Sequence, residues 1–121
     1  MDKETSMSIT KLNKILHQFR QNTNPYNYKF GLCSEFAVAL KRYLHAGQLY
    51  KSGIMHTCLK YKDHYCDING CFTYSKYRTI SPSVSLSPAT KYEIHHIYNL
   101  LDNQAVQSIL KTLKQSSKQI Q

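Results

Sequence analysis

Tryptophan is missing from this chain of 121 residues, and ten tyrosines supply most of its aromatic side chains. No apolar run approaches the roughly 20 residues that a helix needs to span a bilayer, so the sequence predicts no membrane span. Residues 1–6 lack a basic segment followed by an apolar stretch, so we expect no signal peptide and a cytoplasmic location. A hydrophobic share of 41% argues against disorder throughout the chain.

Cysteine pairs at CxxC spacing are also absent, although the chain has four cysteines. These are Cys33, Cys58, Cys66 and Cys71. The missing pairs argue against a structural zinc site of the common type, and the missing secretory signal argues against a disulfide framework. We therefore expect no cofactor and no metal, and we expect Cys58 and Cys66 to be small buried hydrophobes.

Acidic residues are scarce, with 7 Asp and Glu against 16 Lys and Arg, and the formal net charge is +9. A positive surface suits an acidic partner such as nucleic acid. The lysines and arginines are scattered, however, with no run of five or six like charges, so the charge also fits a plain solubilising surface. The net charge alone does not distinguish a surface that binds an acidic partner from one that only keeps the protein soluble.

Helical spacing of apolar residues predicts helices in a single domain over residues 1–121, with residues 1–7 and 116–121 frayed. The first helix follows a cap at Ser6 or Ser8, and the second runs from near Cys33 to Gly47. The last is capped by Asp102 or Asn103. Residues 92–100 fit either a helix or a strand. The apolar positions behind the three helices are Ile9, Leu12, Ile15, Leu16 and Phe19, then Phe36, Ala37, Leu40, Tyr43 and Leu44, then Val106, Ile109, Leu110 and Leu113.

Two β-like runs, Gly53–Lys62 and His64–Ile68, predict a hairpin that turns near residues 62–63. Residues 71–80 read as a third strand or an extended loop, and residues 81–88 as a surface loop rich in Ser and Pro. The expected fold class is α+β. An N-terminal helix and a central cysteine-bearing helix pack on a small antiparallel sheet, and a helix closes the chain.

The hairpin register decides whether His56 and Asp67 can meet. A two-residue turn places Cys58 opposite Asp67, so that His56 lies on the same face and diagonal to the carboxylate. Their Cβ atoms are then roughly 5–8 Å apart, within reach of a hydrogen bond. A turn longer or shorter by one residue would send the two side chains to opposite faces.

Cys33, His56 and Asp67 have the parts of a thiol nucleophile, its base and the residue that orients the base. A thiol at a helix start is favoured as thiolate by the free N–H groups and the helix dipole. The alternative roles are a buried helix-start cysteine, a strand histidine and a turn aspartate. The Cys33 N–H is one candidate oxyanion donor, and the side chain of Asn27 is the second.

Other histidines are less promising. His64 lies at the hairpin turn and reads as a surface residue. His95 and His96 are adjacent, so they face different ways and form no two-histidine metal site. A metal site that uses Cys33, His56 and another cysteine is an alternative, which the irregular spacing disfavours.

The segments Gly31–Leu40, Met55-His56 and Tyr65–Gly70 resemble the papain-like cysteine protease superfamily, and most of all its transglutaminase-like and NlpC/P60-like small domains. The resemblance implies an α+β fold and thiol chemistry at amide carbonyls, namely peptide hydrolysis, deamidation or acyl transfer on a peptide or protein substrate. It gives Cys33, His56 and Asp67 the catalytic roles. This chain is shorter than typical members and has no tryptophan near the cysteine.

The sequence thus favours an enzyme, a small cysteine hydrolase or acyltransferase that acts through a Cys-His-Asp triad. The alternative is a binding or inhibitor protein on the same fold with a degenerate site. Such a protein, of phage or mobile-element origin, would engage a protein or nucleic acid through a basic, tyrosine-rich surface.

Overall fold

The computed structural model describes residues 6–24, 32–52, 56–80 and 85–120. Its fold is α+β, and an N-terminal, a central and a C-terminal helix accompany an antiparallel sheet, as predicted. None of the helices in these ranges is long and apolar enough to cross a membrane. The elements in chain order are α1 (Ile9–Asn22), α3 (Cys33–Leu44), β1 (Gln48–Ser52), β2 (Thr57–Tyr61), β3 (His64–Asp67), β4 (Gly70–Phe72), α4 (Tyr74–Ile80), β5 (Leu86–Pro88), α5 (Lys91–Asn99) and α6 (Asn103–Gln119).

The sheet has the strand order β4-β3-β2-β1-β5, and each neighbouring pair is antiparallel. β2 and β3 form the predicted hairpin, with Lys62 and Asp63 in its turn at φ angles of 49° and 61°. Two successive residues in the left-handed region make the tight turn whose twist matches that of the strands. Tyr61 therefore pairs with His64, as predicted. β2 begins one residue later than His56, so this histidine precedes the strand instead of lying within it.

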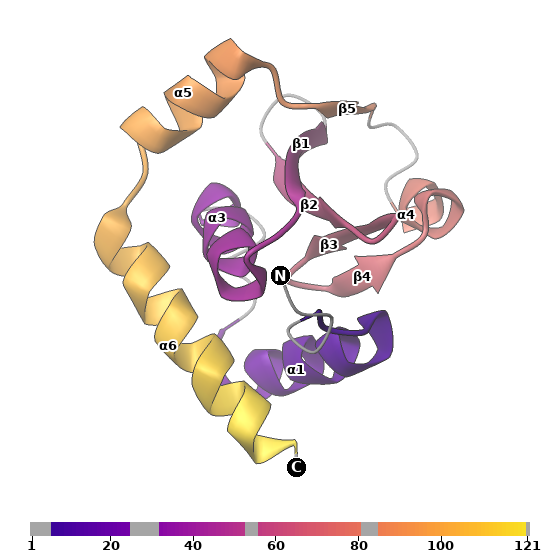
Figure 1. Ribbon diagram of the computed structural model, residues 1–121, viewed down its shortest axis with the longest axis vertical. Helices are drawn as coiled ribbons and strands as arrows, with labels where there is room; N and C mark the ends of the chain where they lie inside the picture. Colours follow the sequence, from indigo (N-terminus) through magenta and orange to yellow (C-terminus); the bar gives the residue numbers. More distant parts are fainter. Residues whose placement is uncertain (1–5, 25–31, 53–55, 81–84, 121) are drawn as a thin grey trace.

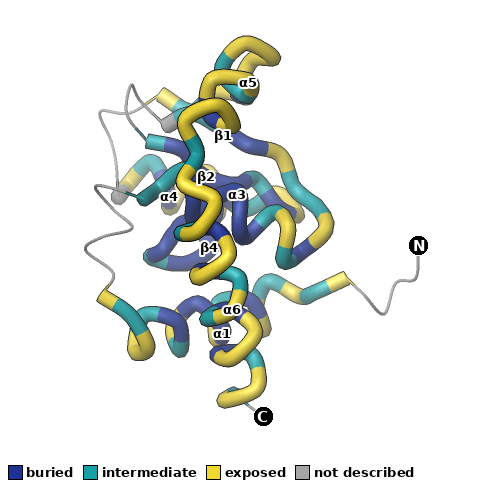
Figure 2. Tube along the Cα trace, turned by 90° about the vertical axis from the view of Figure 1, so that its left-hand side faces the viewer, coloured by how far each residue is buried: buried dark blue, intermediate teal, exposed yellow. Residues whose placement is uncertain are grey.

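The two faces of the sheet are covered unequally (Figure 1). The inner face, with Leu59 and Cys66, joins the main core that α1, α3 and α6 build. The outer face carries a smaller cluster of Cys58 and Tyr65, against which Tyr77 of α4 packs. Figure 2 shows α3 largely buried at the centre and α5 largely exposed at one end of the molecule. The start of α3 is therefore held by a packed helix against the ends of the central strands.

Two helices begin at a side chain that accepts a hydrogen bond from their first turn, and α3 ends at a residue in a left-handed conformation. Ser8 caps α1 by accepting a hydrogen bond from the Lys11 N–H at 3.1 Å. Asp102 caps α6 in the same way, through the Ala105 N–H at 3.1 Å. The second predicted helix ends earlier than expected, because His45 adopts a left-handed conformation with φ of 54° after Leu44. Gly47, which we expected to end the helix, instead leads into β1.

Several sequence predictions for the second half of the chain are wrong or incomplete. Residues 74–80 form α4, a helix, and only residues 70–72 form a strand. Within the predicted loop 81–88, residues 86–88 pair with β1 as the edge strand β5. The open choice for residues 92–100 resolves as helix α5, with a capping box formed by Thr90 and Glu93.

The predicted frayed ends are also partly wrong. α6 continues to Gln119 because Ser116 is fully buried and its hydroxyl accepts a hydrogen bond from the Asn22 side chain at 3.0 Å. At the other end, Met7 packs against the core, and its N–H and carbonyl both bond the Tyr61 hydroxyl, at 3.1 and 2.8 Å. Both ends are tied down by side chains from distant parts of the sequence.

Candidate active site

Cys33 is the first residue of α3 and is half-buried. Leu32, the residue before the helix, makes no side-chain cap hydrogen bond to its first turn. Glu35, in that turn, accepts a hydrogen bond from the Asp102 N–H at 3.0 Å. The buried carboxylate of Glu35 thus ties the cysteine-bearing end of α3 to the start of α6.

His56 and Asp67 meet at the end of the hairpin. The Nε2 atom of His56 lies 3.5 Å from Oδ2 of Asp67, and their side chains are 27% and 10% exposed. Because Nε2 faces the carboxylate, Nδ1 is the ring nitrogen left for the thiol. The side chains of Cys33 and His56 are hydrogen-bonded. The structure therefore brings together the three residues that the sequence singled out.

The thiol and the imidazole shift one another's protonation. Burial acts to raise the pKa of Cys33, but hydrogen bonds with the His56 ring and the Thr57 backbone outweigh it, and the net pKa is lowered from 9.0. The hydrogen bond to Asp67, followed by that to Cys33, raises the pKa of His56 from 6.5 to about 9. These opposite shifts both favour the thiolate–imidazolium pair over the neutral thiol and imidazole.

Asp67 has both of its oxygens engaged. Oδ1 accepts a hydrogen bond from the Asn69 N–H at 2.8 Å, which is the turn role that we weighed as the alternative. Oδ2 faces His56 and also accepts from the Tyr77 hydroxyl at 3.3 Å. The guanidinium of Arg20 is attracted to Asp67 while donating to the Ile68 carbonyl at 2.8 Å. The same carboxylate therefore closes the turn and orients the histidine.

The remaining cysteines are buried and differ from Cys33. Burial, then the Asp67 charge, raises the pKa of Cys58 to about 12. A hydrogen bond with Cys71, then burial, raises the pKa of Cys66. Cys58 and Cys66 are both 0% exposed, which confirms their prediction as buried residues.

Asn27, the predicted side-chain oxyanion donor, lies outside the described residues. Among the described residues, the sequence did not point to the Ser34 hydroxyl and the Thr57 backbone, which both hydrogen-bond the Cys33 sulfur. Their Oγ and Oγ1 atoms are 3.1 Å apart, and Thr57 is 2% exposed. Their position next to Cys33 and His56 in the chain was the available signal.

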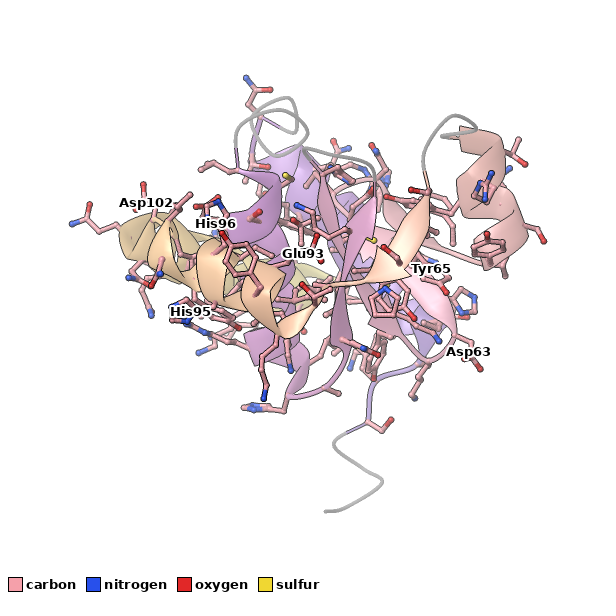
Figure 3. All side chains as sticks on the ribbon, turned by 90° about the horizontal axis from the view of Figure 1, so that it is seen from above. Asp63, Tyr65, Glu93, His95, His96 and Asp102 are labelled. Atoms are coloured by element: carbon pink, nitrogen blue, oxygen red, sulfur yellow. The ribbon has the colours of Figure 1, made fainter. Side chains whose placement is uncertain are left out.

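The other histidines lie elsewhere. His64 bonds the Lys62 carbonyl at 3.0 Å in the hairpin turn. His95 and His96 project from different sides of α5, and Asp63 lies at the far end of the molecule from them (Figure 3). Over the described ranges, no group of three or more His, Cys, Asp and Glu side chains is arranged to hold a metal ion.

Comparison with known proteins adds no relative: the chain matches no model of a protein family, no curated protein and no solved structure.

Proposed function

We propose that the protein is a small cysteine hydrolase or acyltransferase that acts on peptide or protein amide bonds through Cys33, His56 and Asp67. The observation that carries this proposal is the hydrogen-bonded row from the Cys33 thiol through the His56 ring to the Asp67 carboxylate. The lowered pKa of Cys33 and the raised pKa of His56 supply the nucleophile and the acid in one pair.

The reaction follows from this pair. The Cys33 thiolate attacks the amide carbonyl carbon, and the developing oxyanion is stabilised by the Cys33 N–H at the helix start. The His56 imidazolium donates its proton to the departing amine, which leaves a thioester on Cys33 and a neutral imidazole. Water then attacks the thioester while His56 takes its proton, which gives a carboxylic acid and restores the Cys33 thiolate and the His56 imidazolium. An amine acceptor in place of water gives acyl transfer.

The thioester intermediate is testable without the natural substrate. p-Nitrophenyl acetate is an activated ester that should acetylate Cys33, and intact-mass analysis with peptide mapping locates the acetyl group. Cys33→Ala should abolish the burst of p-nitrophenol, whereas Cys71→Ala, which removes a buried thiol, should keep it. Equal bursts from wild type and Cys33→Ala, with both folded by circular dichroism, would contradict the proposal.

Amide cleavage needs a second assay. A pool of fluorogenic peptide amides, with and without added primary amines, separates hydrolysis from acyl transfer. The proposal predicts release of the reporter by wild type and none by Cys33→Ala. Reporter release that survives Cys33→Ala would assign the activity elsewhere.

One observation favours binding as a second candidate function. Four of the five described carboxylates accept a hydrogen bond from backbone N–H groups of their own chain, and these are Glu35, Asp67, Glu93 and Asp102. Hydrogen bonds within the chain thus occupy these acids, and a +9 chain has few other acids to neutralise its cations. Lys60 lies over the Tyr50 ring at 5.7 Å and Arg78 over the Tyr74 ring at 5.8 Å.

This arrangement supports a protein that binds nucleic acid or an acidic protein through a basic, tyrosine-rich surface. Affinity for single-stranded RNA that falls steeply with salt and is unchanged by Cys33→Ala would favour nucleic acid binding. Salt-insensitive or absent binding would exclude it.

A further inference from the structure

Tyr77 is the residue through which α4 reaches the candidate site. Its side chain is 3% exposed, and its hydroxyl donates to Oδ2 of Asp67 at 3.3 Å. That oxygen is also the one that lies 3.5 Å from Nε2 of His56. One carboxylate oxygen therefore joins the imidazole to a phenol from an element that the sequence did not predict.

Asp67 depends on protein donors because its side chain is only 10% exposed. The Asn69 N–H holds Oδ1 at 2.8 Å, and that bond leaves Oδ2 to other donors. The Tyr77 hydroxyl supplies a second point of attachment at Oδ2. With a donor on each oxygen, the carboxylate is held more firmly in the orientation that faces the imidazole.

The Tyr77 ring is itself held in place. It packs in the outer-face cluster with Cys58 and Tyr65, and its ring centroid lies 6.1 Å from that of Tyr65. A phenol locked by packing delivers its hydroxyl without a further loss of side-chain freedom. Figure 3 shows Tyr65, the neighbour in this cluster, on the sheet away from α5.

The titratable and charged groups that face Asp67 come from several elements. Arg20 of α1 is attracted to the carboxylate, and His56 faces it from the residue before β2. Cys58 of β2 interacts with both Asp67 and Tyr77 and is a neutral thiol at ordinary pH. Tyr77 is the member of this group that comes from α4, and its hydroxyl donates to Oδ2 at 3.3 Å.

We propose that Tyr77 is a positioning residue that holds Oδ2 of Asp67 toward His56 and so sustains the thiolate–imidazolium pair. This inference rests on the proposed function in taking Cys33 as the reacting group. Its test reads the ionisation of Cys33 directly, so it does not require that a substrate be known.

The test is the rate of iodoacetamide alkylation of Cys33 as a function of pH in Tyr77→Phe, which removes the hydroxyl and keeps the ring. Without that hydrogen bond the Asp67 carboxylate is less well positioned to stabilise the His56 imidazolium. The imidazolium in turn stabilises the thiolate less, so the apparent pKa of Cys33 should rise. At about pH 6, the alkylation rate should fall roughly threefold to tenfold, since one pKa unit changes the thiolate fraction tenfold. A profile that superimposes on that of wild type overturns the proposal.

Tyr74→Phe is the matched control. It removes one hydroxyl from the same helix, but that hydroxyl accepts from Nη1 of Arg78 at 2.9 Å and the side chain is 48% exposed. Its alkylation profile should match that of wild type. A shift equal to that of Tyr77→Phe would show that any loosening of α4 suffices, and would overturn a specific role for the Tyr77 hydroxyl.

A double-mutant cycle separates positioning from general destabilisation. In an Asp67→Asn background, Tyr77→Phe should change the profile no further, because the carboxylate that it acts through is already gone. Independent, multiplicative effects would overturn the proposal. If circular dichroism shows Tyr77→Phe unfolded, the wild-type hydroxyl proton is measured by NMR, and a Tyr77 proton that exchanges freely with water overturns it instead.

The outcomes distinguish this proposal from the proposed function. If wild type gives no burst with p-nitrophenyl acetate but Tyr77→Phe has a shifted alkylation profile, the enzymatic function is contradicted and the positioning role is supported. A burst with an unshifted profile in Tyr77→Phe would do the reverse.

Discussion

Cysteines lie both at the start of α3 and in the β3–β4 ladder, and the two environments shift the pKa of the thiol in opposite directions. Cys66 and Cys71 face each other across the ladder, are 0% and 4% exposed, and share a hydrogen bond that acts with burial to raise the pKa of Cys66. Cys33 is half-buried beside an imidazole and the Thr57 N–H, and its pKa is lowered.

Burial acts to raise the pKa of both Cys33 and Cys66, so burial does not explain the difference. The two pKa shifts differ because different groups contact the two sulfur atoms. At the ladder the sulfur meets another thiol, which offers no positive charge. At the helix start the sulfur contacts the Thr57 backbone and the His56 ring, whose pKa is raised by Asp67. The ionisation of Cys33 therefore depends on His56 and Asp67 more than on the burial of the cysteine.

The largest expected effect comes from His56→Ala. It removes the main partner that lowers the pKa of Cys33, so this thiol should come to resemble the buried ones. Alkylation of Cys33 by iodoacetamide at about pH 6.5 should slow by on the order of 100-fold, in proportion to the fall in the fraction of Cys33 that is thiolate. His64→Ala changes a turn histidine and is the control, with no change expected. Equal slowing in both variants would show that the loss is not specific to His56.

Asp67→Asn should have the next largest effect. The pKa of His56 should fall from about 9 toward 6.5, since Asp67 is the largest cause of its rise. Alkylation of Cys33 at about pH 6.5 should slow roughly tenfold. Asp63→Asn is the matched control, because asparagine tolerates the φ of 61° in the hairpin turn. NMR titration of the His56 ring gives its pKa directly, and an unchanged value in Asp67→Asn would remove Asp67 from the account.

Cys66→Ala should lower stability without affecting the labelling of Cys33, and Cys33→Ala should do the opposite. Removing the fully buried sulfur of Cys66 should cost about 1 kcal/mol of unfolding free energy and leave Cys33 labelling intact. Removing Cys33 should abolish the labelling and change stability less. Urea unfolding and mass spectrometry on the same samples measure both. A loss of Cys33 reactivity in a folded Cys66→Ala variant would mean that the two places are not independent.

The smallest effect is in the pH dependence of stability. The His56 contribution is fully present below pH 6.5 and is lost as the pH rises through about 9, because its folded pKa is the higher one. The Cys33 contribution is present above pH 9.0 and is lost as the pH falls through its lower folded pKa. Between these limits the two slopes oppose each other.

Cys33→Ala exposes the His56 slope alone, because Asp67 remains beside the ring. The unfolding free energy of this variant, relative to wild type, should therefore fall as the pH rises from about 6.5 to about 9. Urea denaturation at several pH values measures the difference. A difference that stays constant over this range would contradict the paired titration.

The sequence predicted the centre of the molecule better than its edges. Alternation and the turn at residues 62–63 determined the hairpin register, and the apolar stripe of α3 determined where Cys33 lies. Short edge elements were missed. β5 has only three residues, and α4 has seven with a burial pattern set by the sheet beneath it.

The same limit explains what was missed at the site. Tyr77 contacts Asp67 because α4 packs on the outer face of the sheet. The spacing of apolar residues in 71–80 does not predict that packing. Ser116 illustrates the converse, since a polar residue at the predicted frayed end is buried by a hydrogen bond to Asn22, a residue 94 positions away. Contacts between distant segments are what the local pattern does not contain.

The most direct test of the central claim is the alkylation rate of all four cysteines in wild type between about pH 5 and about pH 10, resolved by peptide mapping. The account predicts that Cys33 reacts first throughout, with a rate that rises at a pH below 9.0 and levels off while the buried thiols remain unmodified. Labelling of Cys33 that begins only at pH 9.0 or above, or that keeps pace with Cys58, would contradict it.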